Sequence, residues 1–130
     1  MAPAFHLSLS VSDLERTRRF YVDVLDAQVG RTTDRWADLW LFGAQVTAYE
    51  RPAAVVPSPY RDAQHFGATL DWDAWLALAD RLVDGPVEFR LRPTLDEARG
   101  TAKMMLADPD GYLIEVKAYA DASVLRRPQD

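Results

Sequence analysis

Two histidines and one glutamate are the side chains in this sequence best suited to bind a metal ion. The chain contains only two histidines, and His6 and His65 stand at corresponding positions near the start of two similar halves. Glu115 lies near the end of the second half. A single histidine on a strand is more often structural than a ligand, but the repeated position favours ligation by both. Two imidazoles and one carboxylate suit Fe(II), Mn(II), Ni(II), Co(II) or Zn(II), and they leave coordination positions for water and substrate.

Alternation along the predicted strands indicates which other side chains share a face with these three, because successive strand residues point to opposite sides. The side chains predicted to face the same space are Gln45, Thr47, Tyr49, Lys117 and Tyr119. Tyr49 or Tyr119 is a candidate proton donor or oxyanion stabiliser, and the other three are candidates for substrate binding. Alternatively, each tyrosine packs with its hydroxyl in water, and Lys117 pairs with Glu115.

The first half of the chain is predicted to form one strand, one helix and three further strands. Residues 5–11 alternate strictly between apolar and polar, which is typical of a half-buried strand. Ser12 and Glu15 form a capping-box pattern, and apolar residues recur at helical spacing over residues 13–25. Three shorter strands are predicted near residues 28–31, 36–42 and 45–49, with a turn at 43–44.

The second half repeats this plan. Residues 64–70 form a predicted strand, and Asp71 is a good N-cap for a helix that continues to about residue 83. The Asp-Pro-Asp-Gly sequence at 108–111 is typical of a tight turn. The polar segment 93–103 suits a loop, either a solvated hairpin loop or a mobile cover over the mouth of a cavity. The remaining strands are predicted near residues 87–91, 103–107 and 112–119.

Together the halves predict an α+β fold of two βαβββ modules, which form a curved mixed sheet with both helices outside. We expect a single domain over residues 1–130, with module 1 at about 4–50 and module 2 at about 64–119. Prolines in the connecting segment 51–63 favour an extended linker, and residues 120–130 form a tail. The apolar strand faces should pack under the helices. The polar faces should surround a shared space that contains both histidines and Glu115.

Charge and composition exclude several classes of function. The net charge of -5 disfavours nucleic acid as a partner, because an acidic surface repels phosphates. The absence of cysteine excludes disulfides and thiolate metal ligands. The sequence has no apolar stretch long enough to span a membrane, and its first residues lack the basic segment and apolar run of a signal peptide. We therefore expect a cytoplasmic protein.

The sequence resembles the vicinal oxygen chelate superfamily, which includes glyoxalases, bleomycin resistance proteins and extradiol dioxygenases. The resemblance lies in residues 5–14, in Phe20-Tyr21 and Leu25 of the predicted helix, in His65, and in residues 108–115. The last segment matches the D-P-x-G-x-x-x-E signature of that family. The resemblance implies the βαβββ fold, and it implies that His6, His65 and Glu115 are the metal ligands.

One departure from the family pattern narrows the expected function. Members of the glyoxalase I type carry a second glutamate on the fourth strand, whereas Glu50 has the wrong parity to share a face with Gln45, Thr47 and Tyr49. The resemblance therefore points to three-ligand members, such as extradiol dioxygenases and metal-dependent antibiotic-modifying transferases. The extra acid–base histidine of the extradiol enzymes has no counterpart here.

The resemblance implies a metal-dependent enzyme with dioxygenase, lyase or isomerase chemistry. The ion would chelate two neighbouring oxygens of a small-molecule substrate and stabilise negative charge on them. Paired modules in the family imply a homodimer. The alternative is a non-catalytic protein that binds a small molecule or antibiotic, as bleomycin resistance proteins do. Those proteins lack the metal triad, so the three candidate ligands favour an enzyme.

Overall fold

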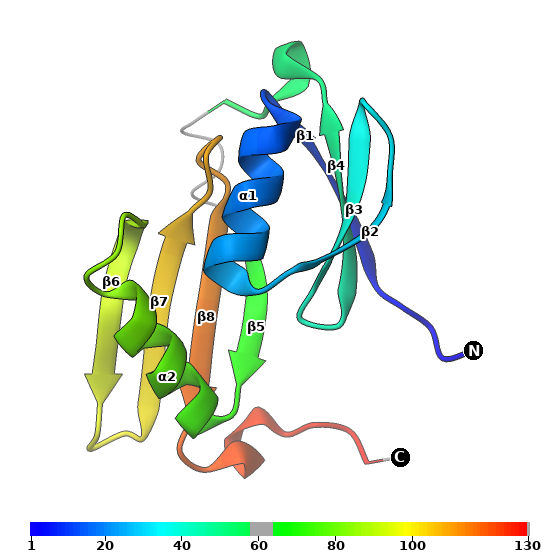
Figure 1. Cartoon of the computed structure of the whole chain (residues 1–130). Helices are drawn as coiled ribbons and strands as arrows, with labels where there is room; N and C mark the ends of the chain where they lie inside the picture. The colour runs from blue at the N-terminus through cyan, green and yellow to red at the C-terminus, as the bar shows by residue number, and fades with distance from the viewer. Residues whose placement is uncertain (58–63, 130) are drawn as a thin grey trace. The chain divides into compact units, whose positions relative to one another are not determined.

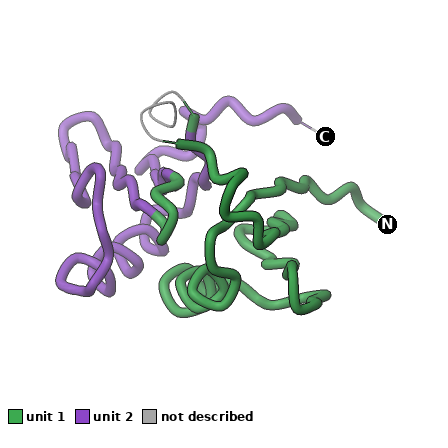
Figure 2. The backbone as a smooth tube through the Cα atoms, turned by 90° about the horizontal axis from the view of Figure 1, so that it is seen from above, with its two compact units in different colours: residues 1–64, 108–112 green, residues 65–107, 113–130 purple. Residues whose placement is uncertain are grey.

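The structure, a computed structural model, describes residues 1–57 and 64–129. The chain divides into two compact units, of which one comprises Met1–Gln64 with Asp108–Tyr112 and the other comprises His65–Ala107 with Leu113–Asp130 (Figure 2). Each unit contains one four-stranded mixed sheet and one α-helix. The predicted α+β class and the βαβββ repeat are therefore confirmed. Neither helix in this described part is long and apolar enough to cross a membrane.

Unit 1 contains sheet A, whose strand order is β1-β4-β3-β2, with β1 parallel to β4 and the other neighbours antiparallel. Its elements are β1 (His6–Val11), α1 (Leu14–Leu25), β2 (Gln28–Thr32), β3 (Trp36–Leu41), β4 (Ala44–Glu50) and the short 3-10 helix η1 (Pro52–Ala54). Helix α1 packs on one face of the sheet over β3 and β4 (Figure 1). Val11, Tyr21, Leu39 and Ala48 are fully buried. Among the described residues of this unit, no α-helix packs on the opposite face of sheet A.

Helix α1 begins one residue later than the capping-box pattern predicted. Asp13 is the N-cap, and its carboxylate accepts a hydrogen bond from the backbone N–H of Arg16 at 2.9 Å. Ser12 instead donates to Asp110 through both its backbone N–H and its hydroxyl. The prediction was wrong because a partner distant in sequence binds the Ser12 hydroxyl, and a local pattern carries no information about that partner.

Unit 2 contains sheet B, whose order β5-β8-β7-β6 repeats that of sheet A. Its elements are β5 (Phe66–Leu70), α2 (Trp72–Leu82), β6 (Glu88–Asp96), β7 (Thr101–Ala107), β8 (Leu113–Tyr119) and the 3-10 helix η3 (Ala122–Leu125). Helix α2 packs on β8 and β7 (Figure 1). Trp75, a residue of α2, is buried against the sheet and donates its indole N–H to the backbone oxygen of Val116 at 2.8 Å. This anchor fixes which side chains of β8 face away from the helix.

The loop predicted at residues 93–103 is mostly strand. Strand β6 continues to Asp96 and pairs there with Thr101 of β7, so only residues 97–100 form the turn. Pro93 is tolerated because β6 is an edge strand whose register shifts between Leu91 and Thr94. The segment is therefore not a cover over a cavity. The predicted extended linker also begins differently, with η1, and its positions 58–63 lie outside the described residues.

Candidate metal site

His65 and Glu115 lie side by side in unit 2. His65 immediately precedes β5, Glu115 is on the neighbouring parallel strand β8, and the register pairs Gly67 with Glu115. The Nε2 atom of His65 lies 3.7 Å from Oε2 of Glu115, and the two side chains are 43% and 22% exposed. Ile114 and Val116, the neighbours of Glu115, are fully buried, so Glu115 projects from the sheet face opposite the helix. The pair is held in place and remains accessible to an ion.

Gly67 makes this approach of the two strands possible. A Cβ atom added at Gly67 would lie only 1.7 Å from the backbone oxygen of Glu115. Any side chain at this position would therefore push β5 away from β8. Because His65 is two residues before Gly67, the same displacement would separate His65 from Glu115.

A depression of about 260 Å³ surrounds this pair, and its walls include His65, Gly67, Thr69, Glu115 and Lys117. The Nζ atom of Lys117 lies 4.0 Å from Oε1 of Glu115. It also lies 6.0 Å from the centre of the Tyr119 ring. Four of the residues predicted from sequence thus come together on the open face of sheet B. The predicted pairing of Lys117 with Glu115 is present as a long ion pair.

The other four predicted residues share the open face of sheet A. Along the parallel strands β1 and β4, His6 pairs with Gln45 and Ser8 pairs with Thr47, while Tyr49 follows two residues later. Val46 and Ala48 point to the other face of β4, whereas Thr47 is buried as well, on the same face as Gln45 and Tyr49. His6 itself is exposed. Unit 1 therefore presents one histidine on the same kind of helix-free face as unit 2.

Asp38 is a buried carboxylate on this face that the sequence analysis missed. Its Oδ1 atom accepts a hydrogen bond from the hydroxyl of Thr47 at 2.7 Å, and its Oδ2 atom accepts one from Nε of Arg31 at 2.7 Å. Burial alone raises the pKa of Asp38, but the hydrogen bonds from Thr47 and Arg31 outweigh it and hold the pKa below its ordinary value. Asp38 is therefore ionised, and Thr47 uses its hydroxyl internally. The sequence did offer a signal for Asp38. Side chains alternate along β3, which puts Trp36, Asp38 and Trp40 on the face opposite Ala37 and Leu39.

Tyr49 is surrounded by aromatic and cationic groups. Its ring centre lies 6.3 Å from that of Trp36, and the guanidinium of Arg51 lies 4.6 Å from it. Arg31 similarly lies 5.3 Å from the Trp36 ring. This part of sheet A could accept a flat ligand between aromatic surfaces and guanidinium groups.

The signature turn at Asp108–Tyr112 belongs to unit 1, although it precedes β8 in sequence. The buried hydroxyl of Tyr21 donates to Oδ2 of Asp108 at 2.8 Å, and Tyr112 donates to the backbone oxygen of Ser10 at 2.7 Å. Burial raises the pKa of Asp108, and burial and the neighbouring carboxylate raise that of Tyr21. Gly111 adopts a φ of 83°, which favours glycine. The two aspartates of the signature are therefore structural.

A sequence model of the Glyoxalase/Bleomycin resistance protein/Dioxygenase superfamily matches residues 4–116. The chain belongs to this superfamily. The match covers the first βαβββ repeat, the second as far as the middle of β8, and all three of the predicted metal ligands.

Individual relatives within the superfamily span different activities. The chain is 33% identical over 131 residues to a catechol-2,3-dioxygenase of Bacillus subtilis (strain 168), covering 96% of this chain and 44% of that enzyme. It therefore spans less than half the length of that relative. A glyoxalase/bleomycin resistance protein/dioxygenase from Alicyclobacillus acidocaldarius has a similar structure, with 25% identity, 92% coverage of each chain and a TM-score of 0.73. The fosfomycin resistance protein FosX from Listeria monocytogenes shares the fold, with 17% identity, coverage of 91% of this chain and 93% of that chain, and a TM-score of 0.73.

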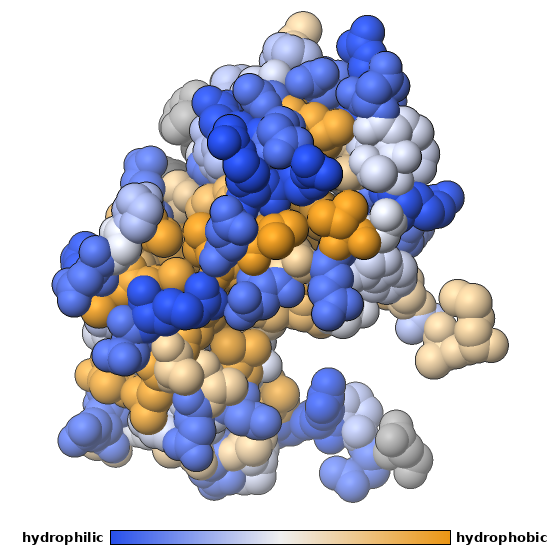
Figure 3. Space-filling view, viewed as in Figure 1, coloured by the Kyte–Doolittle hydropathy of each residue, from blue (hydrophilic) through white to orange (hydrophobic). Residues whose placement is uncertain are grey.

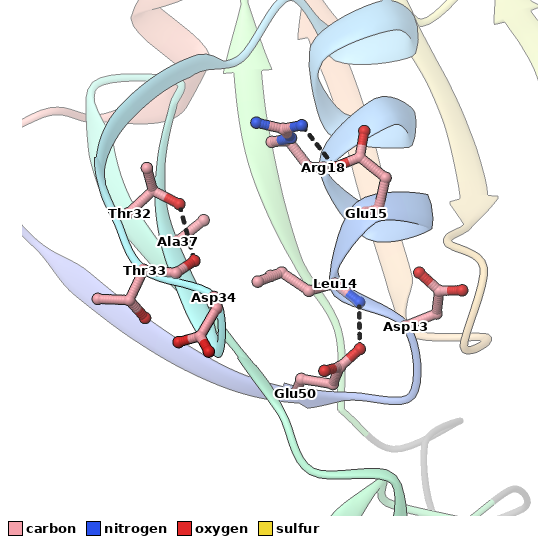
Figure 4. A pocket seen from close by; sticks show the side chains of 9 residues that line it. All are labelled: Asp13, Leu14, Glu15, Arg18, Thr32, Thr33, Asp34, Ala37 and Glu50. Atoms are coloured by element: carbon pink, nitrogen blue, oxygen red, sulfur yellow. Dashed lines mark hydrogen bonds and ion pairs between the residues drawn. The ribbon is translucent and has the colours of Figure 1, made fainter.

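Glu50, at the end of β4, faces the helix and not the face that carries Gln45, Thr47 and Tyr49. It pairs with Val11, and its Oε1 atom accepts a hydrogen bond from the backbone N–H of Leu14 at 3.2 Å. It borders a depression of about 290 Å³ beside the first turn of α1, which Asp13 and Asp34 also line (Figure 4). Hydrophilic side chains cover the outside of this turn (Figure 3). Glu50 thus binds a backbone N–H of the first turn of α1, beside the N-cap Asp13.

Unit 2 contains two of the three predicted metal ligands, His65 and Glu115, and their geometry suits a shared ion. Two ligands of one ion at about 2.1 Å lie roughly 3.0–3.5 Å apart, so the 3.7 Å separation of His65 and Glu115 needs only a small side-chain rotation. Across the described residues, no group of three potential ligands is assembled. His6, the remaining predicted ligand, stands on β1 of unit 1.

Proposed function

We propose that this protein is a metal-dependent enzyme in which His6, His65 and Glu115 hold one divalent ion, namely Fe(II), Mn(II), Ni(II), Co(II) or Zn(II). The observation that carries the proposal is the 3.7 Å approach of His65 and Glu115 at the wall of an accessible depression. One imidazole and one carboxylate make a weak site. His6 is the only other imidazole of the chain and starts the equivalent first strand of the other repeat.

When bound, the ion supplies Lewis acidity toward two neighbouring oxygens of a small-molecule substrate. The protein's own side chains would then orient the substrate and move protons. Tyr119 and Tyr49 are the proposed proton donors or oxyanion stabilisers, and Gln45 and Lys117 the proposed substrate contacts. Thr47 acts indirectly, because its hydroxyl holds the buried Asp38 carboxylate.

The relative from Bacillus subtilis favours a dioxygenase among the possible reactions, with a vicinal diol such as catechol as the first substrate to test. Lyase and isomerase chemistry remain the other candidates. The chain has no third histidine for acid–base work, so a tyrosine would have to take that role. Oxygen consumption in the presence of catechol and Fe(II) distinguishes the dioxygenase from the other two reactions.

The second candidate function is non-catalytic binding of a small molecule or antibiotic. The aromatic and cationic surroundings of Tyr49 favour it, because such a surface can hold a flat ligand without chemistry. Metal content separates the two candidates. A protein that never takes up a divalent ion would be a binding protein.

The test is metal stoichiometry, measured with circular dichroism, for His6→Ala, His65→Ala and Glu115→Ala. Each variant should keep its fold and lose most of the bound metal, because His6 and His65 are exposed and Glu115 is only partly buried, so their truncation removes little packing. Ser8→Ala is the matched control, since Ser8 lies next to His6 on the same face and should leave metal bound. Thr47→Ala is unsuitable as a control because of its bond to Asp38. Full metal occupancy in all three ligand variants would refute the site.

The proposal also includes a cytoplasmic homodimer, as the family resemblance implies. In the described part of the chain, each sheet has one face without an α-helix of its own unit, which leaves surface for a second copy to cover.

A further inference from the structure

Four side chains form a row across the open face of sheet B, next to the proposed metal ligands. The register places Thr69 of β5 opposite Lys117 of β8, Lys117 opposite Lys103 of β7, and Lys103 opposite Thr94 of β6. Directly paired residues of neighbouring strands point to the same side of a sheet. The row Thr69–Lys117–Lys103–Thr94 is therefore adjacent to the row that contains Gly67 and Glu115.

The two lysines in this row are the only lysines of the chain. The sequence has 15 basic residues, and the other 13 are arginines. Two ammonium groups directly opposite each other on a sheet repel, and such pairs destabilise a strand pairing. Their position on one face, in a protein of net charge -5, therefore calls for a negative partner.

The protein itself supplies little negative charge here. Glu115 lies 4.0 Å from Nζ of Lys117, at the outer limit of an ion pair. No carboxylate lies within ion-pair distance of Lys103 among residues 1–57 and 64–129. Lys103 is exposed, and the Lys117 side chain is 40% exposed, so both ammonium groups can reach a ligand.

We propose that Lys103 and Lys117, with the hydroxyl of Thr69, bind the oxyanion group of a small organic acid. Lys117 and Thr69 line the same depression as His65 and Glu115, which puts this group beside the metal ligands. That the lysines bind an organic acid does not depend on the proposed function. That this acid is the substrate rests on the proposed function. With Glu115 engaged by a divalent ion, Lys117 loses the carboxylate with which it pairs among the described residues. The ligand's negative charge then offsets part of the positive charge of the ion and both lysines.

Carboxylate and phosphonate share the required chemistry, because an ammonium group donates to either without a fixed geometry. A neutral ligand would leave the repulsion between the lysines uncompensated. An ion pair between Lys117 and Glu115 alone accounts for one lysine and leaves Lys103 unexplained. The oxyanion accounts for both.

The first test is calorimetric titration of the wild-type protein with benzoate, phenylphosphonate and the neutral benzyl alcohol. It is performed once with excess EDTA and once with Mn(II). We expect at least one of the two anions to bind, and benzyl alcohol to bind at least about tenfold more weakly, because a charge-assisted hydrogen bond is lost. The tighter of the two anions identifies the acid group. Equal binding of all three probes, or binding of none, would overturn the inference.

The second test uses Lys103→Gln, Lys117→Gln and the double variant, with Arg127→Gln as the matched control for the loss of one exposed cation. Each lysine variant should weaken anion binding by about tenfold, Lys103→Arg should restore much of it, and Arg127→Gln should change it little. Unchanged anion affinity in the double variant would overturn the inference.

Metal stoichiometry of the same variants keeps the two proposals apart. If the lysine variants keep their metal and lose the anion, both proposals stand. If no protein binds metal but the anion still depends on the lysines, the proposed enzyme fails and the anion site remains. In addition, ¹³C-methylation labels only these two lysines and the amino terminus, so both lysine signals should shift when phenylphosphonate is added.

Discussion

Tyr21→Phe tests whether the signature turn is bound to unit 1 by the contact that the structure places there. The substitution removes one oxygen from a fully buried side chain and leaves its packing unchanged. Oδ1 of Asp108 accepts the backbone N–H groups of Asp110 and Tyr112, both at 2.9 Å. Within the described part of the chain, the Tyr21 hydroxyl is the only donor to Oδ2, at 2.8 Å. The variant therefore leaves a buried carboxylate oxygen without a donor.

A buried hydrogen bond to a charged group contributes about 1.5–3 kcal/mol, so we expect Tyr21→Phe to lower the free energy of unfolding by about 2–3 kcal/mol at pH 7. For a chain of this length the unfolding entropy is roughly 270 cal/mol/K, and the expected fall in Tm is about 7–11 °C. Burial raises the pKa of Asp108, so this carboxyl takes up a proton in the folded state before it does in the unfolded state. As pH falls through that raised pKa, Tyr21 of the wild type donates to a neutral carboxyl group. The loss of stability caused by Tyr21→Phe should therefore be smaller at low pH.

Thermal unfolding followed by circular dichroism at several pH values measures both effects. Tyr49→Phe is the matched control, because the Tyr49 hydroxyl makes no hydrogen bond to the described residues. It should shift Tm little. If Tyr21→Phe and Tyr49→Phe melt at the same temperature at pH 7, the buried bond contributes nothing and the reasoning is refuted.

Three further predictions follow from the two sheets. Gly67→Ala should destabilise the protein by more than about 3 kcal/mol and release the metal, because its Cβ would overlap the Glu115 carbonyl; urea unfolding and metal analysis test this, and a native-like variant would contradict it. The pKa of Asp38 is lowered in the folded state, so its stabilising contribution is present above the ordinary value of 3.8 and is lost as pH falls through the lower folded value; acid unfolding should therefore be shallower in Asp38→Asn than in the wild type. Sedimentation should give a species larger than the 14.7 kDa monomer, and a monomer at micromolar concentration would exclude the homodimer.

The repeating elements could be predicted from sequence because their signals are local. Strict alternation over residues 5–11 and helical spacing over 13–25 depend only on neighbouring side chains, and the observed strand and helix lie within a residue of those bounds. The segment 93–103 was misjudged because its polar residues resemble a loop. As part of a two-strand hairpin at the sheet edge, it can be extended with polar side chains facing solvent.

The candidate site could be predicted only in part, because the sequence pattern of one strand carries no information about its pairing with other strands. Face parity within one strand indicated that Glu115 and Lys117 share a side. The partnership of Lys117 with Lys103 depends on the register between β7 and β8, which no single strand encodes. Asp38 could have been found by applying parity to β3. Its bonds to Thr47 and Arg31 required the pairing of β3 with its neighbours.

The membership of Asp108–Tyr112 in unit 1 has a consequence for the order in which this protein can fold during synthesis. All four strands of sheet A and helix α1 have been made by residue 50, yet the partners of Ser12 and Tyr21 are translated some 60 residues later. Until then the nascent first half lacks the acceptor of the buried Tyr21 hydroxyl and the acceptor of the Ser12 backbone N–H. The emerging first module should therefore be loosely ordered on the ribosome, and protection of its amides from hydrogen exchange should rise only after residue 112 has left the exit tunnel.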